Sequence, residues 1–140
     1  LKLRSYRVPF FVYAPKIIKG GRTISSVSQL VDIMPTVCGL TGVEYSNRTM
    51  GRDLFNDSVP NDPLALIVNN KVAKSHIAVI GKNYYLSMQK DGGDIQLHQL
   101  DSNNPLVDVK EKYPEITVNY SRRLRGLYET SKYMLYHNKN

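Results

Sequence analysis

Four short strand-like segments lie close together in the middle of the chain, and their spacing limits the fold more than any other feature. They are rich in β-branched and aromatic residues and cover Leu64–Val68, His76–Ile80, Asn83–Met88 and Ile95–Gln99. The connections between them are short, whereas a parallel crossover needs a dozen or more residues. The sequence therefore predicts a small antiparallel sheet of four strands.

Glycines mark the two later connections of this predicted sheet. Gly81-Lys82 is typical of a two-residue type II′ hairpin with glycine in its first position. Asn83 is the weakest strand residue and fits the turn as well as the strand. The longer connection, Lys90–Asp94, holds two glycines between two aspartates, and turn formation explains these aspartates better than calcium binding does.

A long amphipathic helix is predicted at the end of the chain, over Pro114–His137. Its apolar residues at helical spacing are Ile116, Tyr120, Leu124, Leu127, Tyr128, Met134 and Leu135. Gly126 leaves open whether the helix is continuous. Because the apolar stripe must be buried, we expect the helix to cover one face of the sheet, which gives an α+β fold.

The N-terminal third has a different pattern, a strand followed by a short helix. The apolar run Val8–Tyr13 predicts a buried strand with Pro9 at its beginning. Asp32 is a suitable N-cap for the helix, Pro35 fits its first turn, and Gly42 is placed to end it. The residues expected to form its apolar stripe are Ile33, Met34, Val37 and Cys38.

Composition excludes two classes of protein. The chain is 41% hydrophobic and 22% charged, as in globular domains, and holds no apolar run near the roughly 18 residues that span a bilayer. Cys38 is its single cysteine, so a disulfide scaffold is excluded. On the expected apolar stripe, Cys38 is interpreted as a buried structural residue rather than a nucleophile.

The net charge of +7 suggests a polyanionic partner, but its distribution weakens that interpretation. Basic residues occur along the whole chain, and the densest group is Arg122-Arg123-Leu124-Arg125. A nucleic-acid binder usually concentrates its charge and adds a recognisable motif, so we expect no specific nucleic-acid partner. A free-standing basic binding module for a polyanion remains the alternative function.

No catalytic or metal-binding constellation is apparent. His76, His98 and His137 are widely separated, and the spacings typical of metal ligands are absent. Gly20-Gly21 lacks the lysine and serine of a phosphate-binding loop and is interpreted as a turn. The residues by themselves therefore predict no catalytic and no metal-ligating residue in this chain.

Several motifs together resemble the sulfatase family. They are Arg7-Val-Pro-Phe-Phe-Val-Tyr-Ala-Pro15, Gly20-Gly21, Val31-Asp-Ile-Met-Pro-Thr-Val-Cys-Gly-Leu-Thr-Gly42, Met50-Gly-Arg-Asp-Leu-Phe55 and Ile95-Gln-Leu-His-Gln-Leu-Asp-Ser-Asn-Asn-Pro105. The last motif departs from the family pattern at His98, Gln99 and Asn104. The end of the final helix, Tyr128–Asn138, is most similar to the lipoteichoic-acid-synthase-like branch, the phosphoglycerol transferases.

This resemblance implies the C-terminal portion of a metal-dependent enzyme of the alkaline phosphatase superfamily. Residues 1–58 would be the C-terminal end of its catalytic α/β domain, contributing a strand and the Asp-x-x-Pro-Thr helix. Residues 59–140 would be the C-terminal subdomain of sheet and helix. Such an enzyme acts on sulfate or phosphate esters, is extracytoplasmic, and in this branch is membrane-anchored. The sequence does not decide whether the substrate is a sulfate or a phosphate ester, which acceptor is used, or which residue type is the nucleophile.

The same resemblance places every catalytic group outside this chain. The nucleophile (formylglycine, Ser or Thr) and the ligands of a divalent metal, Ca, Mn or Mg, would all precede Leu1, so the chain alone is expected to be inactive. Arg7 is the single candidate for substrate contact, because it directly precedes the Val-Pro strand, although we favour a structural ion pair.

The chain starts at Leu1 without a methionine, and we expect a fragment whose main partner is the rest of the catalytic domain. A strand Val8–Tyr13 without its neighbours would have unpaired edges. We therefore expect self-association through this segment, or its partial disorder, in the isolated chain.

Overall fold

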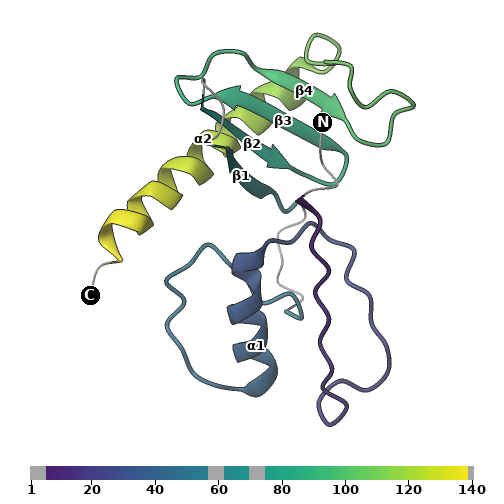
Figure 1. Cartoon of the computed structure of the whole chain (residues 1–140), viewed down its shortest axis with the longest axis vertical. Coiled ribbons are helices and arrows are strands. Elements are labelled where there is room, and N and C mark those ends of the chain that lie inside the picture. Colours follow the sequence, from purple (N-terminus) through teal and green to yellow (C-terminus); the bar gives the residue numbers. More distant parts are fainter. Residues whose placement is uncertain (1–5, 57–61, 70–74, 139–140) are drawn as a thin grey trace.

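The computed structural model describes residues 6–56, 62–69 and 75–138, which form a sheet-and-helix part and a smaller N-terminal part (Figure 1). The N-terminal part holds a short 3-10 helix, Leu30–Asp32, and α1, Ile33–Thr41. The elements of the larger part are β1 (Ala65–Asn69), β2 (His76–Ile80), β3 (Tyr84–Gln89), β4 (Gln96–Gln99) and α2 (Pro114–His137). The protein is thus of the α+β class. None of the described helices is long and apolar enough to cross a membrane.

The four strands form one antiparallel sheet in the order β1-β2-β3-β4. The register places Ile77 opposite Met88, and Leu86 opposite both Val79 and Leu97. The predicted meander is therefore confirmed, with strand ends that differ by one residue at β1, β3 and β4.

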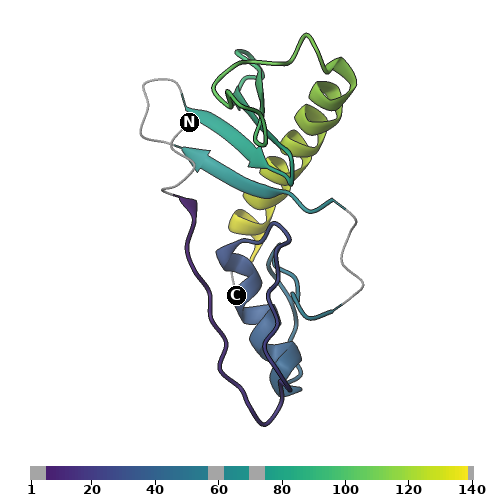
Figure 2. The same cartoon turned by 90° about the vertical axis from the view of Figure 1, so that its right-hand side faces the viewer.

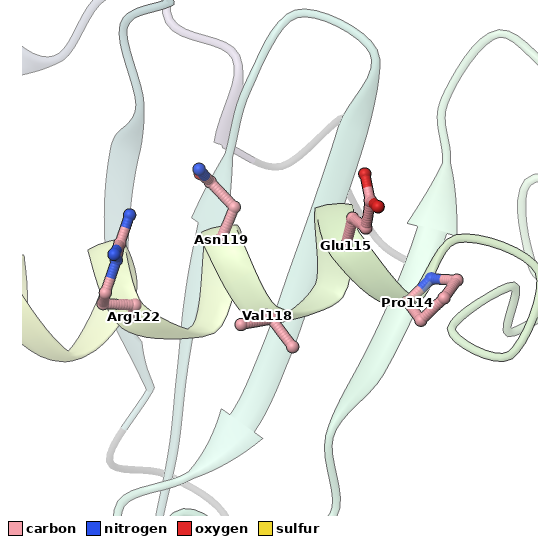
Figure 3. Close-up of a pocket in the computed structure, with 5 residues that line it drawn as sticks. All are labelled: Pro114, Glu115, Val118, Asn119 and Arg122. Atoms are coloured by element: carbon pink, nitrogen blue, oxygen red, sulfur yellow. The ribbon is translucent and has the colours of Figure 1, made fainter.

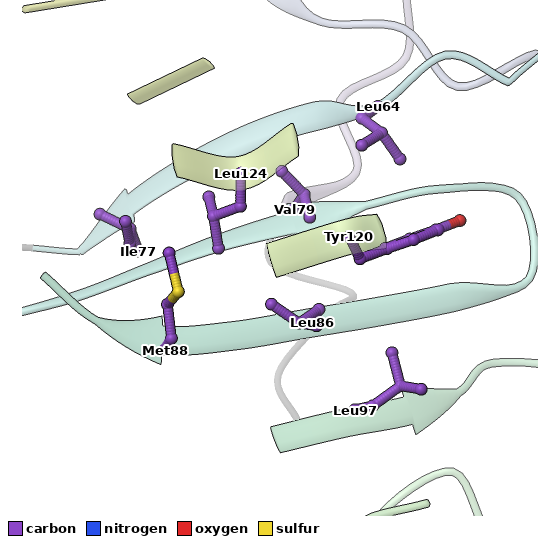
Figure 4. Close-up of a cluster of buried hydrophobic side chains, with 8 residues drawn as sticks. All are labelled: Leu64, Ile77, Val79, Leu86, Met88, Leu97, Tyr120 and Leu124. Carbon is purple, nitrogen blue, oxygen red and sulfur yellow. The ribbon is translucent and has the colours of Figure 1, made fainter. Parts of the chain in front are cut away.

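Helix α2 lies across one face of this sheet (Figures 1 and 4). Alternate residues of the strands point to this face and meet the helix there. The buried cluster consists of Leu64, Ile77, Val79, Leu86, Met88, Leu97, Tyr120 and Leu124. Covering of the sheet by the C-terminal helix is thus as predicted.

The turn between β2 and β3 differs from the predicted hairpin. The Gly81 N–H donates to the Tyr84 carbonyl at 2.9 Å, so Lys82 and Asn83 are the turn residues and Gly81 has no positive φ. The reason for glycine here is α2: a Cβ at Gly81 would lie 2.3 Å from the Tyr120 hydroxyl oxygen. Close helix packing, rather than turn conformation, requires the glycine.

Helix α2 continues through Gly126, and its predicted stripe is buried only along part of its length. Tyr120 and Leu124 are buried, whereas Leu135 is 74% exposed. A helix of 24 residues is about 36 Å long, and four strands are only about 15 Å across, so its last turns extend past the sheet. There the Asn138 side chain donates to the Arg48 carbonyl of the N-terminal part at 2.6 Å.

The predicted strand Val8–Tyr13 is not formed. The segment runs extended along the side of the N-terminal part (Figures 1 and 2), but it belongs to no sheet. No hydrogen bond joins its backbone to any other residue in the described ranges. A strand needs a neighbour for its N–H and C=O groups, and the described part of the chain places none beside it.

Helix α1 begins and ends as predicted, but it buries a different face. Gly42 ends it in the left-handed conformation at φ 68°. Pro35, Thr36 and Cys38 are buried, whereas Met34 and Val37 are 62% and 41% exposed, so the predicted stripe is wrong for these two residues. Polar contacts of Thr36, described below, turn this face inward.

Candidate functional site

Asp32 and Thr36 join the start of α1 to the loop that follows it. The Asp32 carboxylate is 2% exposed and accepts from the backbone N–H groups of Gln29, at 2.7 Å, and Arg52, at 3.0 Å. The Thr36 hydroxyl donates to the Asp32 carbonyl at 2.6 Å and accepts from the Leu54 N–H at 3.1 Å. We call these contacts the Asp32–Thr36 clamp.

The clamp corrects the role predicted for Asp32. Its side chain makes no capping bond to α1; it accepts from one N–H before the helix and one far beyond it. A short 3-10 helix, Leu30–Asp32, takes the place of a conventional N-cap. The Asp-x-x-Pro-Thr motif is thus a structural element that fixes the loop, since its two polar side chains are used by backbone groups.

Gly51 completes the clamp because only glycine fits at its position. A Cβ there would lie 1.9 Å from the Val31 carbonyl oxygen and 3.1 Å from the Asp32 nitrogen, both of them backbone atoms. Next to it, the Arg52 guanidinium donates to the Val27 carbonyl. The loop is therefore held against the chain on both sides of α1's first turn.

Gln29 connects this part of the protein to the edge of the sheet. Its side-chain oxygen accepts from the Leu66 N–H at 2.9 Å, and its side-chain nitrogen donates to the Leu64 carbonyl at 3.4 Å. The amide thus occupies the place that a neighbouring strand would take along β1. Sequence reasoning missed Gln29, and no local pattern distinguishes it.

Arg7, the candidate for substrate contact, is exposed at the start of the extended segment. In the described ranges it forms neither an ion pair nor a hydrogen bond, so the structural ion pair that we favoured is not formed there.

The three histidines lie apart and have different environments. His76 contacts Asp94 at 3.4 Å, and this hydrogen bond lowers the pKa of the Asp94 carboxyl. His98 is buried, with Nδ1 3.1 Å from the Val107 carbonyl oxygen. His137 stacks on Tyr133 near the end of α2.

The structure also locates the acidic residues considered for metal binding and for the turn between β3 and β4. Within the described residues, no three His, Cys, Asp or Glu side chains are grouped so that they could hold a metal ion. The divalent metal implied by the resemblance therefore has no fitting donor set here. Asp91 accepts from the Gly93 N–H at 2.9 Å, as expected of a turn.

Only part of the densest basic group is fully exposed. Leu124 is buried, and Arg123 pairs with Asp62 while lying over the Tyr120 ring. Arg125 points to the β3–β4 turn at Gly92, and Arg122 is exposed. Arg122 and Arg125 therefore remain exposed, three residues apart on α2.

A shallow depression lies at the start of α2 (Figure 3). Its lining residues are Pro114, Glu115, Val118, Asn119 and Arg122. They project from successive turns of one exposed helix face and do not converge on a common point (Figure 3). The depression therefore lacks the convergent polar groups of a catalytic or ligand site.

Exposed apolar side chains are concentrated in the N-terminal part. Of the nineteen exposed large apolar residues in the described ranges, twelve lie between residues 6 and 45. Phe11 and Tyr13 are 87% and 93% exposed, and Leu30, Met34 and Val37 form an uncovered stripe along the 3-10 helix and α1. Exposed apolar patches are typical of protein–protein or membrane interaction sites and of ligand-binding grooves.

Cys38 provides a direct test of the buried face of α1. It is a free, buried thiol, so we expect a thiol reagent to label it only when the protein unfolds. Labelling should follow the unfolding transition in a denaturant series. Because Val37 is exposed, Val37→Ala should change the free energy of unfolding by less than about 1 kcal/mol. Rapid labelling of Cys38 in the native protein would contradict the observed orientation of the helix.

Comparison with known proteins gives no match for this sequence, either among protein-family models or among curated proteins. The resemblance therefore depends on the motifs themselves.

Proposed function

We propose that this chain is the C-terminal portion of a metal-dependent enzyme that acts on sulfate or phosphate esters, similar to the sulfatases and phosphoglycerol transferases. Its role there is structural: it completes the catalytic domain and supplies no nucleophile and no metal ligand. In this proposal the enzyme is extracytoplasmic, and residues 1–58 and 59–140 belong to its catalytic domain and C-terminal subdomain.

The observation that carries the proposal is the exposed apolar surface of the N-terminal part, together with the extended segment that pairs with no strand in the described ranges. Within the described ranges, no hydrogen bond reaches the backbone of the apolar segment Val8–Tyr13. Leu30 in the 3-10 helix and Met34 and Val37 in α1 are exposed as well. A strand needs neighbouring strands and an apolar helix face must pack on another element, and a layered α/β domain meets both requirements. The rest of the catalytic domain is therefore the partner that we propose for this surface.

The Asp32–Thr36 clamp gives additional support. Two of the motifs behind the resemblance, Asp32–Thr36 and Gly51–Leu54, contact each other through the clamp. The two motifs lie about twenty residues apart in sequence, and these hydrogen bonds make the loop and the helix pack as one unit. Their physical dependence explains why such motifs appear as a pair.

The polyanion-binding alternative has no comparable support. Arg123 is paired with Asp62, so the densest basic group leaves only Arg122 and Arg125 exposed. We therefore do not propose it as a second function.

The proposal is tested on the natural protein that contains this chain. The segment preceding Leu1 should hold a Cys, Ser or Thr nucleophile and an Asp-His or Asp-Asn pair. The complete protein should hydrolyse aryl sulfate or aryl phosphate esters, or transfer phosphoglycerol, and a chelator should abolish that activity. A preceding segment without these residues would overturn the proposal.

The isolated 140 residues should be inactive. The resemblance places the nucleophile before Leu1, and the described residues hold no metal donor set. We therefore expect no turnover of p-nitrophenyl sulfate or p-nitrophenyl phosphate above the buffer rate, with or without added Ca, Mn or Mg. The assay is followed by absorbance after repurification of the protein. Metal-dependent turnover that persists through repurification would show that this chain holds a catalytic site.

A further inference from the structure

The extended segment Val8–Tyr13 has one edge with a complete set of hydrogen-bonding groups. Along extended backbone, alternate residues direct their N–H and C=O groups to opposite edges. Val8, Phe10 and Val12 share one edge, and each of them has an N–H. The opposite edge includes Pro9, which has none. The first edge, here named the Phe10 edge, is therefore the better template for another strand.

We propose that a second copy of this chain pairs antiparallel with the Phe10 edge, about a two-fold axis that passes between the two copies of Phe10. This register brings Phe10 opposite Phe10 and Val8 opposite Val12 of the other copy. All three side chains are apolar, and Phe10 is 42% exposed in the single chain. The dimer would gain about six inter-strand hydrogen bonds.

The other face of the segment is self-complementary in the same register. Arg7 comes opposite Tyr13 of the second copy, and Pro9 comes opposite Phe11. Arg7, Phe11 and Tyr13 are all exposed, and Arg7 has no ion-pair partner in the described ranges. A guanidinium over a tyrosine ring is favourable, so the basic residue stabilises this pairing instead of opposing it.

Other registers are less favourable. A two-fold axis at Phe11 uses the opposite edge and loses about two hydrogen bonds, because Pro9 donates none in either copy. An axis at Val12 keeps the Phe10 edge but puts Val8 opposite Lys16 and leaves Phe10 against Ala14. A second copy therefore fits best at Phe10.

The test isolates the contribution of one N–H on each edge. Phe10→Leu and Phe10→Pro differ in the Phe10-edge N–H, and Phe11→Leu and Phe11→Pro differ in the N–H of the opposite edge. We measure the dimer dissociation constant of the four variants and the unchanged chain by sedimentation equilibrium. Proline should weaken the dimer at least about tenfold relative to leucine at position 10, and by a much smaller factor at position 11.

Disulfide trapping tests the register. In a Cys38→Ala background, Phe10→Cys places two cysteines opposite each other at a Cα separation of about 5.5 Å, within reach of a disulfide, whereas Val8→Cys does not. Mild oxidation should yield covalent dimer with Phe10→Cys and far less with Val8→Cys.

Each outcome bears on the inference. An unchanged chain that stays monomeric up to its solubility limit, equal proline effects at both positions, or equal trapping at both cysteines would overturn it. The inference concerns the isolated chain and uses no enzymatic readout, so its failure would leave the proposed function untouched. In the proposed parent enzyme, a neighbouring strand of the catalytic domain would occupy this edge instead.

Discussion

Replacing Leu124 by alanine should lower the free energy of unfolding by about 2–5 kcal/mol. Leu124 is fully buried where α2 crosses the sheet, within the cluster that includes Ile77, Val79 and Met88 (Figure 4). The change removes three carbon atoms from a site where α2 packs on residues of two strands, β2 and β3, so the cavity cannot close without moving a strand or the helix. The measurement is the denaturation midpoint followed by far-ultraviolet circular dichroism.

Leu135→Ala is the matched control for this prediction. It makes the same chemical change in the same helix, but Leu135 is 74% exposed beyond the sheet. We expect its stability to remain within about 0.5 kcal/mol of the unchanged chain. Equal losses for the two variants would mean that α2 does not cross the sheet at Leu124.

Gly51→Ala should destabilise the N-terminal part by about 2 kcal/mol or more. The added Cβ would lie 1.9 Å from the Val31 carbonyl oxygen, and because this is a backbone atom, no side-chain movement can relieve the overlap. The loop must move away from α1, which breaks the bonds from Arg52 to Asp32 and from Leu54 to Thr36. Loss of protection from hydrogen exchange at these two amides is the direct readout.

Labelling of Cys38 gives a second measurement of the movement of the loop away from α1. Once the loop separates, this buried thiol becomes accessible, and we expect Gly51→Ala to raise its labelling rate at least about tenfold. Gly21→Ala is the control, because a Cβ at Gly21 meets nothing within 4 Å and its φ is not positive. A native labelling rate that is equal in the two variants would show that Gly51 does not hold the loop.

The sheet and both helices follow from patterns that are local in sequence. Short connections between β-rich segments favour antiparallel pairing of consecutive strands. Pro114 and Gly42 fix helix ends through their own backbone preferences. Such signals operate within a few residues, so they are readable before any tertiary contact is known.

The Val8–Tyr13 segment shows where local signals fail. Its composition predicts a buried strand, yet burial and pairing require a neighbouring strand, and the described chain provides none. The prediction of an unpaired edge follows from the same reasoning, and within the described ranges no backbone hydrogen bond reaches the segment. What that edge binds depends on another segment or another molecule.

Sequence alone determined the α+β class, the antiparallel order and the ends of α1 and α2, because each depends on periodicity and on backbone preferences of single residues. Tertiary structure alone decided which face of α1 is buried. It also decided that the Asp32 carboxylate accepts a hydrogen bond from the Arg52 N–H, and the Gln29 side-chain oxygen one from the Leu66 N–H. Those contacts join residues twenty or more positions apart. Their energies depend on which backbone groups the folded chain brings together, and no local pattern encodes that choice.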